Sequence, residues 1–186
     1  MKLTRISALL VAAVLPLAAC DSGTDPDDLD FGEFRGDVSG EFSADLNGRA
    51  NSGITQGFTG GQDQILLSDA GEGVQIAVFH QDAEFVLGTS PVGPDDEVGV
   101  TAAIFFEDAG RAFLATSGTM VIDEITTGGI LGSIAFSAVE FDINTGQTLS
   151  DRVSVDVVFN TDFSTSCCFN RAPFSGTVRL HKTPVN

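Results

Sequence analysis

The stretch Arg152–Phe159, with the sequence RVSVDVVF, decides the fold class. Valine or phenylalanine occupies every second position from 153 to 159, and these residues alternate with the polar residues Arg152, Ser154 and Asp156. Successive side chains of a β-strand point to opposite faces, so this pattern predicts a strand with one buried face and one solvent-facing face.

The same period of two recurs along most of the chain, and turn residues separate the repeats. Asn47-Gly48 is typical of a hairpin turn, and Glu107–Gly110 predicts another. We therefore expect an all-β fold, a single antiparallel β-sandwich or barrel-like domain of about nine or ten short strands. The alternating segments are residues 42–46, 74–79, 98–106, 134–138, 153–159 and 174–180.

The β-domain is expected to span residues 37–183, where no linker-like change of composition occurs, and residues 184–186 form a short tail. A domain of this length can bury about two thirds of the surface that its unfolded chain exposes. It therefore needs neither a metal nor a disulfide to be stable. Whether the sheet closes into a barrel depends on register and shear, which the pattern does not reveal.

The N-terminus has the organisation of a secretory signal peptide. Lys2 and Arg5 provide a positive start, an uncharged apolar run follows over residues 6–15, and small residues precede Cys20. The run is shorter than the roughly 20 apolar residues that a membrane-spanning helix needs. We therefore expect residues 1–19 to be a signal peptide.

The end of this segment, Leu17-Ala18-Ala19-Cys20, resembles the lipobox of bacterial lipoproteins. The resemblance implies that Cys20 is lipidated on its sulfur, that the chain is cut before it, and that the new amino group is acylated. Cys20 would then be the mature N-terminus and the membrane anchor. The rival interpretation is a plain signal peptide cut after Ala19.

Residues 20–36 are predicted to be a flexible acidic tether. The segment Asp25–Asp30 has few apolar side chains and cannot contribute to a core. Asp28 and Asp30 have the spacing of the first two ligands of a calcium loop, but Gly32 stands where the third ligand belongs. We therefore expect a tether, and with the lipobox it predicts a lipoprotein of the cell envelope. The outer membrane, on its periplasmic or its surface side, is favoured over the inner membrane.

The charge of the chain excludes one class of partner. Without residues 1–19 the chain has seven basic and 26 acidic residues, a net charge of −19. A surface of this sign repels phosphate, so nucleic acid is not an expected partner.

Three motifs in order resemble a family of secreted bacterial lipoproteins of unknown function, common in Bacteroidetes-like lineages. They are FSADLNG at residues 42–48, SGTMVI at 117–122 and GSIAFSA at 132–138. Ile134 stands where the family tends to have an aromatic residue. The resemblance covers most of the predicted domain and implies a fold, but it implies no activity.

Few residues indicate catalysis. The two histidines, His80 and His181, both end predicted strands, where histidines usually face solvent. Asp142–Gly146 has some character of a calcium loop, but hairpin-turn chemistry explains it better. The adjacent carboxylates Asp123 and Glu124 would point to opposite faces of a strand and so could not flank one bond. No catalytic residue, metal or cofactor is therefore predicted.

Cys167 and Cys168 would be the only free thiols if Cys20 is acylated. Neighbouring cysteines can close only a strained disulfide ring, because their Cα atoms are about 3.8 Å apart. A vicinal disulfide or a reduced pair within a loop is favoured over an intermolecular bridge.

These features predict a membrane-anchored, non-enzymatic β-domain that acts as a binding or structural module. The membrane is the partner of the N-terminal lipid, and an envelope protein or a small apolar ligand is a possible partner of the domain. The alternative function is a barrel-like carrier of a small apolar ligand, with an interior lined by Phe and Val. A glycoside hydrolase that uses paired carboxylates ranks last, and the absence of Trp and Tyr lowers the odds of a sugar-binding module.

Overall fold

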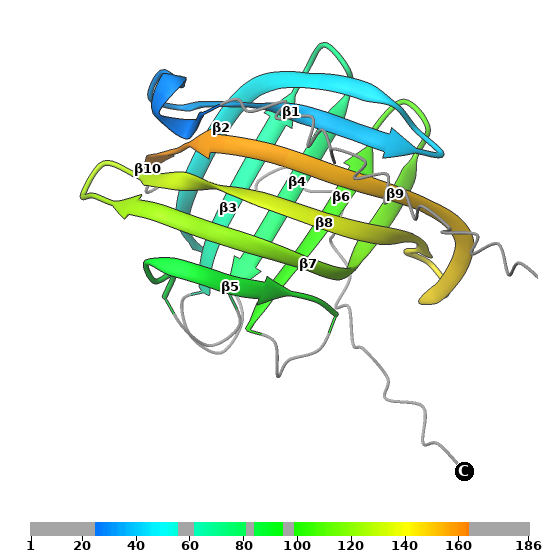
Figure 1. Cartoon of the computed structure of the whole chain (residues 1–186). Helices are drawn as coiled ribbons and strands as arrows, with labels where there is room; N and C mark the ends of the chain where they lie inside the picture. Colours follow the sequence, from blue (N-terminus) through cyan, green and yellow to red (C-terminus); the bar gives the residue numbers. More distant parts are fainter. Residues whose placement is uncertain (1–24, 56–61, 81–83, 95–98, 164–186) are drawn as a thin grey trace, which may run out of the picture.

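In the computed structural model of the chain, residues 25–55, 62–80, 84–94 and 99–163 are described. They form ten strands and one short 3₁₀ helix, η1 (Figure 1). The all-β prediction is therefore confirmed. The elements are η1 (Pro26–Asp28), β1 (Glu33–Gly40), β2 (Ala44–Thr55), β3 (Gln62–Asp69), β4 (Val74–His80), β5 (Gly88–Val92), β6 (Val100–Phe106), β7 (Arg111–Ile125), β8 (Ile130–Asp142), β9 (Gln147–Asn160) and β10 (Asp162–Phe163).

The strands form one sheet that closes on itself. Following the pairings, β1 is bonded to β9, then β8, β7, β6, β4, β3 and β2, and β2 pairs again with β1. β5 lies beside the second half of β7, and β10 lies beside β2. Among the described strands all pairings are antiparallel except two short parallel ones, β5 with β6 and β10 with β2. The sheet is therefore barrel-like.

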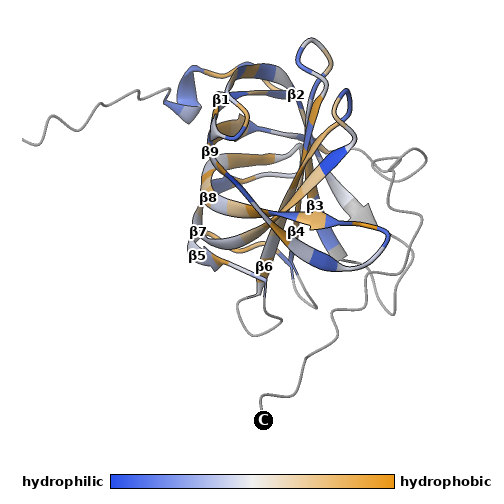
Figure 2. Cartoon of the chain, turned by 90° about the vertical axis from the view of Figure 1, so that its right-hand side faces the viewer, coloured by the Kyte–Doolittle hydropathy of each residue, from blue (hydrophilic) through white to orange (hydrophobic). Residues whose placement is uncertain are grey.

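Two layers of strands enclose the core. In Figure 1, β1, β9, β8, β7 and β5 run side by side in front, and β3, β4 and β6 cross behind them. Figure 2 shows the same two layers from the side, and hydrophobic residues (orange) alternate with more hydrophilic ones along their strands. The outer faces of the two layers are thus the two broad surfaces of the domain.

The alternation predicted from sequence places one set of side chains inside the ring. In β6 and β9 every second residue is buried, as expected for residues 100–106 and 153–159. Phe34, Phe113 and Phe159 are at most 1% exposed and occupy the interior. Each such side chain stabilises the fold by about 1.5–3 kcal/mol relative to its exposed state.

One rim of the ring is covered by aromatic side chains and a guanidinium. Phe42 stacks on Phe106 with ring centroids 4.3 Å apart and meets Phe113 edge-on at 5.9 Å. The guanidinium carbon of Arg111 lies 5.0 Å from the Phe42 ring centroid and 5.3 Å from that of Phe113. Arg111 also binds Glu140 and Asp151, with Nη2–O distances of 2.5 Å in each case. The rim is thus held by one cation shared between β7, β8 and β9.

The predicted boundary of the tether, residues 20–36, is wrong at its C-terminal end. Leu29 is buried, and the side-chain amide of Asn160 donates a hydrogen bond to its carbonyl at 3.1 Å. β1 then begins at Glu33, and Phe34 is wholly inside the core. Two apolar residues among the carboxylates are enough to fix this segment, because β9 provides a long strand for β1 to pair with.

The predicted hairpin turn at Asn47-Gly48 is also wrong, because both residues lie within β2. Asn47 pairs with Arg35 and Gly48 with Phe34. A Cβ atom at Gly48 would lie 2.2 Å from the carbonyl oxygen of Ser68. The glycine is therefore needed for close packing in an extended strand. The turns at Glu107–Gly110 and Asp142–Gly146 are confirmed by their position between paired strands.

Asp69 ends β3 and stabilises the turn into β4. Its carboxylate accepts hydrogen bonds from the backbone N–H groups of Asn47, Gly71 and Glu72 at 2.8, 2.8 and 3.1 Å. Burial raises the pKa of Asp69, but these donors outweigh it and hold the pKa below its ordinary value.

Candidate binding face

The outer face of the layer β1–β9–β8–β7 carries a row of four serines. Ser39 of β1 lies opposite Ser154 of β9, Ser154 opposite Ser137 of β8, and Ser137 opposite Ser117 of β7. All four are exposed, since the inward positions on these strands hold the core residues. Neighbouring strands are about 4.8 Å apart, so the row is about 14 Å long.

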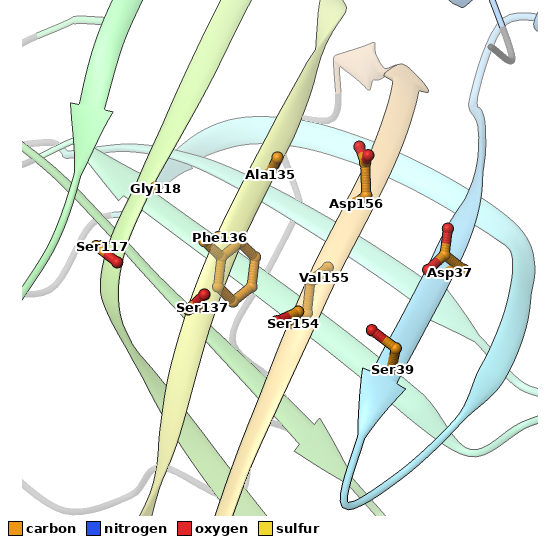
Figure 3. A pocket seen from close by; sticks show the side chains of 10 residues that line it. All are labelled: Asp37, Ser39, Ser117, Gly118, Ala135, Phe136, Ser137, Ser154, Val155 and Asp156. Atoms are coloured by element: carbon orange, nitrogen blue, oxygen red, sulfur yellow. The ribbon is translucent and has the colours of Figure 1, made fainter. Parts of the chain in front are cut away.

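These serines form the floor of a shallow depression of about 520 Å³ (Figure 3). Ala135 of β8 continues the floor, and Asp37 and Asp156 stand at one side of it. The floor is low because its exposed side chains are serine and alanine, while the larger side chains of Phe136 and Val155, which also line it, are buried. We call this surface, made of Asp37, Ser39, Ser117, Ala135, Ser137, Ser154 and Asp156, the serine–aspartate face.

Close strand packing adds to the flatness at the β7 end of the face. A Cβ atom at Gly118 would lie 2.4 Å from the carbonyl oxygen of Ala135. A register shift between Ala115 and Ser117 turns Ser117 outward. This β-bulge therefore aligns the fourth serine with the other three.

Three carboxylates lie directly opposite one another beside the serines. Asp45 of β2 pairs with Asp37 of β1, and Asp37 pairs with Asp156 of β9. Like charges at directly opposite positions of a sheet destabilise it by about 0.2–1 kcal/mol for each pair. The row thus gives the face a concentrated negative charge at a cost in stability.

The chemistry of the face is that of hydrogen bonding and charge. Serine hydroxyls both donate and accept hydrogen bonds, whereas ionised carboxylates only accept them. A ligand that offers N–H donors and positive charge would match both groups.

The acidic residues that the sequence offers as candidates for catalysis or calcium binding do not lie at this face. Asp123 and Glu124 are both exposed, because a register shift between Ile122 and Glu124 interrupts their pairing with β8. Asp28 lies in η1 and Asp30 just before β1, both exposed. In the part of the chain that the structure describes, no group of three His, Cys, Asp or Glu side chains could hold a metal ion.

Asp142 and His80 each have a local structural environment. The backbone N–H of Asn144 and the hydroxyl of Thr145 donate to the carboxylate of Asp142, and they lower its pKa. This is the hairpin-turn chemistry expected from the sequence. His80 ends β4 as predicted, but it is half-buried and meets the Phe85 ring edge-on at 5.8 Å. The expectation that it faces solvent is therefore wrong, because Phe85 covers it.

The remaining predicted residues, Cys20, Cys167, Cys168 and His181, lie outside the described residues. Among those that are described, no helix has the length and apolar character needed to cross a bilayer.

The serine–aspartate face was not predicted from the sequence. Each of its residues occupies an outward position of an alternating strand, where serine and aspartate are ordinary surface residues. The face can be recognised only from the strand register, which brings its four serines into one row and its two aspartates, with the adjacent Asp45, into the neighbouring row.

The chain was compared with protein-family models, with curated proteins and with solved structures, and no significant match was found. The resemblance to secreted lipoproteins of unknown function therefore stays a prediction.

Proposed function

We propose that the chain is a lipid-anchored lipoprotein of the cell envelope, with a non-enzymatic β-domain that acts as a binding module. The order of features at the N-terminus supports the lipid anchor: Lys2 and Arg5 come first, an apolar run follows, and Leu17-Ala18-Ala19-Cys20 ends it. Only the residues between Cys20 and Asp25 separate the anchor from the first described residue. Such a short connection would keep the domain close to the membrane.

The single structural observation that carries the binding role is the serine–aspartate face. It is a shallow depression whose row of serines is about 14 Å long, and its exposed side chains are small or acidic. An extended backbone can approach such a surface closely, and the carboxylates of Asp37 and Asp156 favour a basic segment. We therefore propose a Lys- or Arg-rich segment of another envelope protein as the partner.

The charge of the chain without residues 1–19 supports the same partner. A net charge of −19 attracts basic surfaces at long range and accelerates their encounter. The carrier of a small apolar ligand stays an alternative prediction. The core side chains of Phe34, Phe113 and Phe159, which occupy the ring interior, do not favour it.

Binding of a decalysine peptide to the lipid-free chain (Cys20→Ser) tests the role of the face. The double variant Asp37→Asn/Asp156→Asn should weaken binding about fivefold, which corresponds to about 1 kcal/mol for two exposed ion pairs. The control Asp123→Asn/Glu124→Gln changes the net charge equally on exposed residues outside the face, and should change affinity little. Equal losses in the two variants would mean that binding follows net charge and not this face.

A second comparison tests the shape of the face without changing charge. Ser137→Gln fills the centre of the depression, and Ser150→Gln places the same side chain on an exposed position outside it. Only the first should weaken peptide binding.

Cell fractionation of the wild type and of Cys20→Ser tests the lipid anchor, because only the wild type should stay with the membranes.

A further inference from the structure

Three exposed apolar side chains lie at the end of the ring that carries η1. Phe31 is 56% exposed, Phe163 43% and Ile125 42%. They belong to the η1–β1 connection, to β10 and to the end of β7, and these segments lie together at the left of Figure 1. Among the described residues no other phenylalanine is exposed. We call Phe31, Ile125 and Phe163 the apolar tip.

Gly128, in the turn between β7 and β8, is the contact that the two phenylalanines share. The backbone N–H of Phe163 donates a hydrogen bond to the carbonyl of Gly128 at 2.6 Å. A Cβ atom at Gly128 would lie 3.2 Å from Cζ of Phe31, so the ring packs closely against the turn. Ile125 ends β7, shortly before Gly128. The three side chains of the tip are thus grouped around one turn.

Hydrogen bonds hold the segments of the tip together. The hydroxyl oxygen of Thr126 accepts hydrogen bonds from the backbone N–H groups of Gly128 and Gly129, at 3.1 Å in both cases. The backbone N–H of Gly32 donates to the carbonyl of Asn160 at 2.7 Å. The tip is therefore exposed although its backbone is well bonded. Clustered apolar side chains on a protein surface are typical of sites that contact another protein or a membrane.

The lipid anchor of the proposed function would bring this end of the ring to the membrane. The chain from Cys20 to Asp25 can span at most about 18 Å when extended. From Ile130, beside the tip, to Asp142, at the far end of the ring, β8 is about 40 Å long. A domain standing on its far end would hold Asp25 farther from the bilayer than this connection can reach. The anchor therefore keeps the apolar tip near the bilayer.

The charge around the tip specifies the kind of lipid surface. Residues 25–33, 123–130 and 160–163, which form this end of the ring, contain eight Asp or Glu residues and no Lys or Arg. Anionic headgroups would repel these carboxylates, whereas the ammonium groups of zwitterionic headgroups can pair with them. A second copy of the chain is a poor occupant, because two copies with a net charge of −19 each repel each other.

We propose that the apolar tip inserts into the membrane that holds Cys20, at the boundary between zwitterionic headgroups and acyl chains. This inference rests on the lipid anchor of the proposed function. The anchor raises the effective concentration of the tip at the bilayer to about the millimolar range, so three side chains are enough for insertion. The serine–aspartate face lies farther along the same strands and stays accessible to its partner.

A single tryptophan reports insertion, because the chain contains no Trp or Tyr. Phe31→Trp places it in the tip, and Ile143→Trp places it at the far end of the ring, where Ile143 is 45% exposed. The lipidated variants are reconstituted in vesicles of brominated phosphatidylcholine, whose bromine atoms quench tryptophan inside the bilayer. Phe31→Trp should lose about half of its fluorescence, and Ile143→Trp should lose little. Equal quenching of the two, or none at Phe31→Trp, would overturn the proposal.

A second anchor separates insertion of the tip from lipidation of Cys20. A hexahistidine segment in place of residues 1–19, with Cys20→Ser, binds the chain to nickel-chelating lipid in the same vesicles. Quenching is measured relative to vesicles without bromine. Quenching of Phe31→Trp here supports insertion even if cells do not acylate Cys20. An absence of quenching here would refute insertion and leave the native anchor unaffected.

Matched substitutions test the side chains of the tip. Ile125→Ser/Phe163→Ser should lower the quenching of Phe31→Trp at least about twofold, because two of the three inserting groups are lost. Ile143→Ser/Leu149→Ser removes two equally exposed apolar side chains from the far end of the ring and should leave the quenching unchanged. Equal losses in the two double variants, each shown to be folded by circular dichroism, would contradict the proposal.

Two further measurements test the choice of occupant. Replacement of part of the phosphatidylcholine by phosphatidylglycerol, at constant bromine content, should lower the quenching of Phe31→Trp, and a rise would contradict the selection of zwitterionic lipid. Sedimentation of the lipid-free chain (Cys20→Ser) should show a monomer. A dimer that Phe31→Ser dissociates would assign the tip to a second copy and overturn the proposal.

Discussion

Replacement of Arg111 by methionine should destabilise the domain more than any other change of a surface charge in the described chain. The guanidinium donates two hydrogen bonds to the carboxylate of Glu140 and one to that of Asp151, and it lies 3.6 Å from Glu41. The hydrogen bonds to Glu140, the largest contribution, raise the pKa of Arg111 although desolvation opposes them. Methionine keeps an apolar side chain over Phe42, so the change removes mainly the charge.

The expected loss follows from the exposure of the partners. The side chains of Arg111 and Glu140 are 23% and 14% exposed, between the limits of a buried and a surface pair. Removal of one partner from a buried pair costs about 3–5 kcal/mol, whereas an exposed pair contributes about 0.2–1 kcal/mol. We therefore expect Arg111→Met to lower the free energy of unfolding by about 2–3 kcal/mol.

Urea denaturation of the lipid-free chain, followed by circular dichroism, measures this loss. Arg35→Met is the matched control, because Arg35 forms a 3.8 Å pair with Glu33 in which both side chains are more than 40% exposed. The control should lose no more than about 0.5 kcal/mol. The double variant Arg111→Met/Glu140→Gln should be less destabilised than the sum of its single variants. A loss for Arg111→Met no greater than that of the control would refute the idea that this cation holds the rim.

Three further predictions concern single side chains. Phe159→Ala should lower the free energy of unfolding by about 3–5 kcal/mol in urea denaturation, because it empties a fully buried site. Asp156→Asn should raise it by about 0.2–1 kcal/mol by relieving repulsion from Asp37, and a loss would mean that the two carboxylates do not repel. The folded-state pKa of Asp69 is below its unfolded value of about 4, so its contribution is full above that pH and is lost as the pH falls through the folded value. Acid unfolding of Asp69→Asn should therefore depend less steeply on pH than that of the wild type, and identical profiles would contradict this.

The sequence was most informative where one strand has a strict alternation. Residues 153–159 and 100–106 have the predicted inward faces, because burial of one face is a local property of a strand. β3 was missed, since its apolar residues, Ile65, Leu66 and Leu67, are consecutive and show no period of two. In the structure, Ile65 and Leu67 are buried in the core and Leu66, which points outward, is partly buried.

The failures share a long-range cause. Asn47-Gly48 has the composition of a turn, but β1 and β3 both pair with β2 and keep it extended. The end of the tether was misplaced because the binding of Leu29 by Asn160 joins residues 131 positions apart. The serine–aspartate face likewise exists only through the register of four strands. Pairings of this range are set by the closure of the whole ring, which no local pattern encodes.

The most direct test of the central claim, a lipid anchor at Cys20, is the mass of the N-terminal tryptic peptide from the membrane fraction of expressing cells. Trypsin should release Cys20–Arg35, since Arg35 is the first basic residue after the anchor. Our account predicts this peptide with added acyl chains, and its loss when globomycin blocks cleavage before the cysteine. An unmodified peptide, recovered from the culture medium as part of a free protein, would contradict the account.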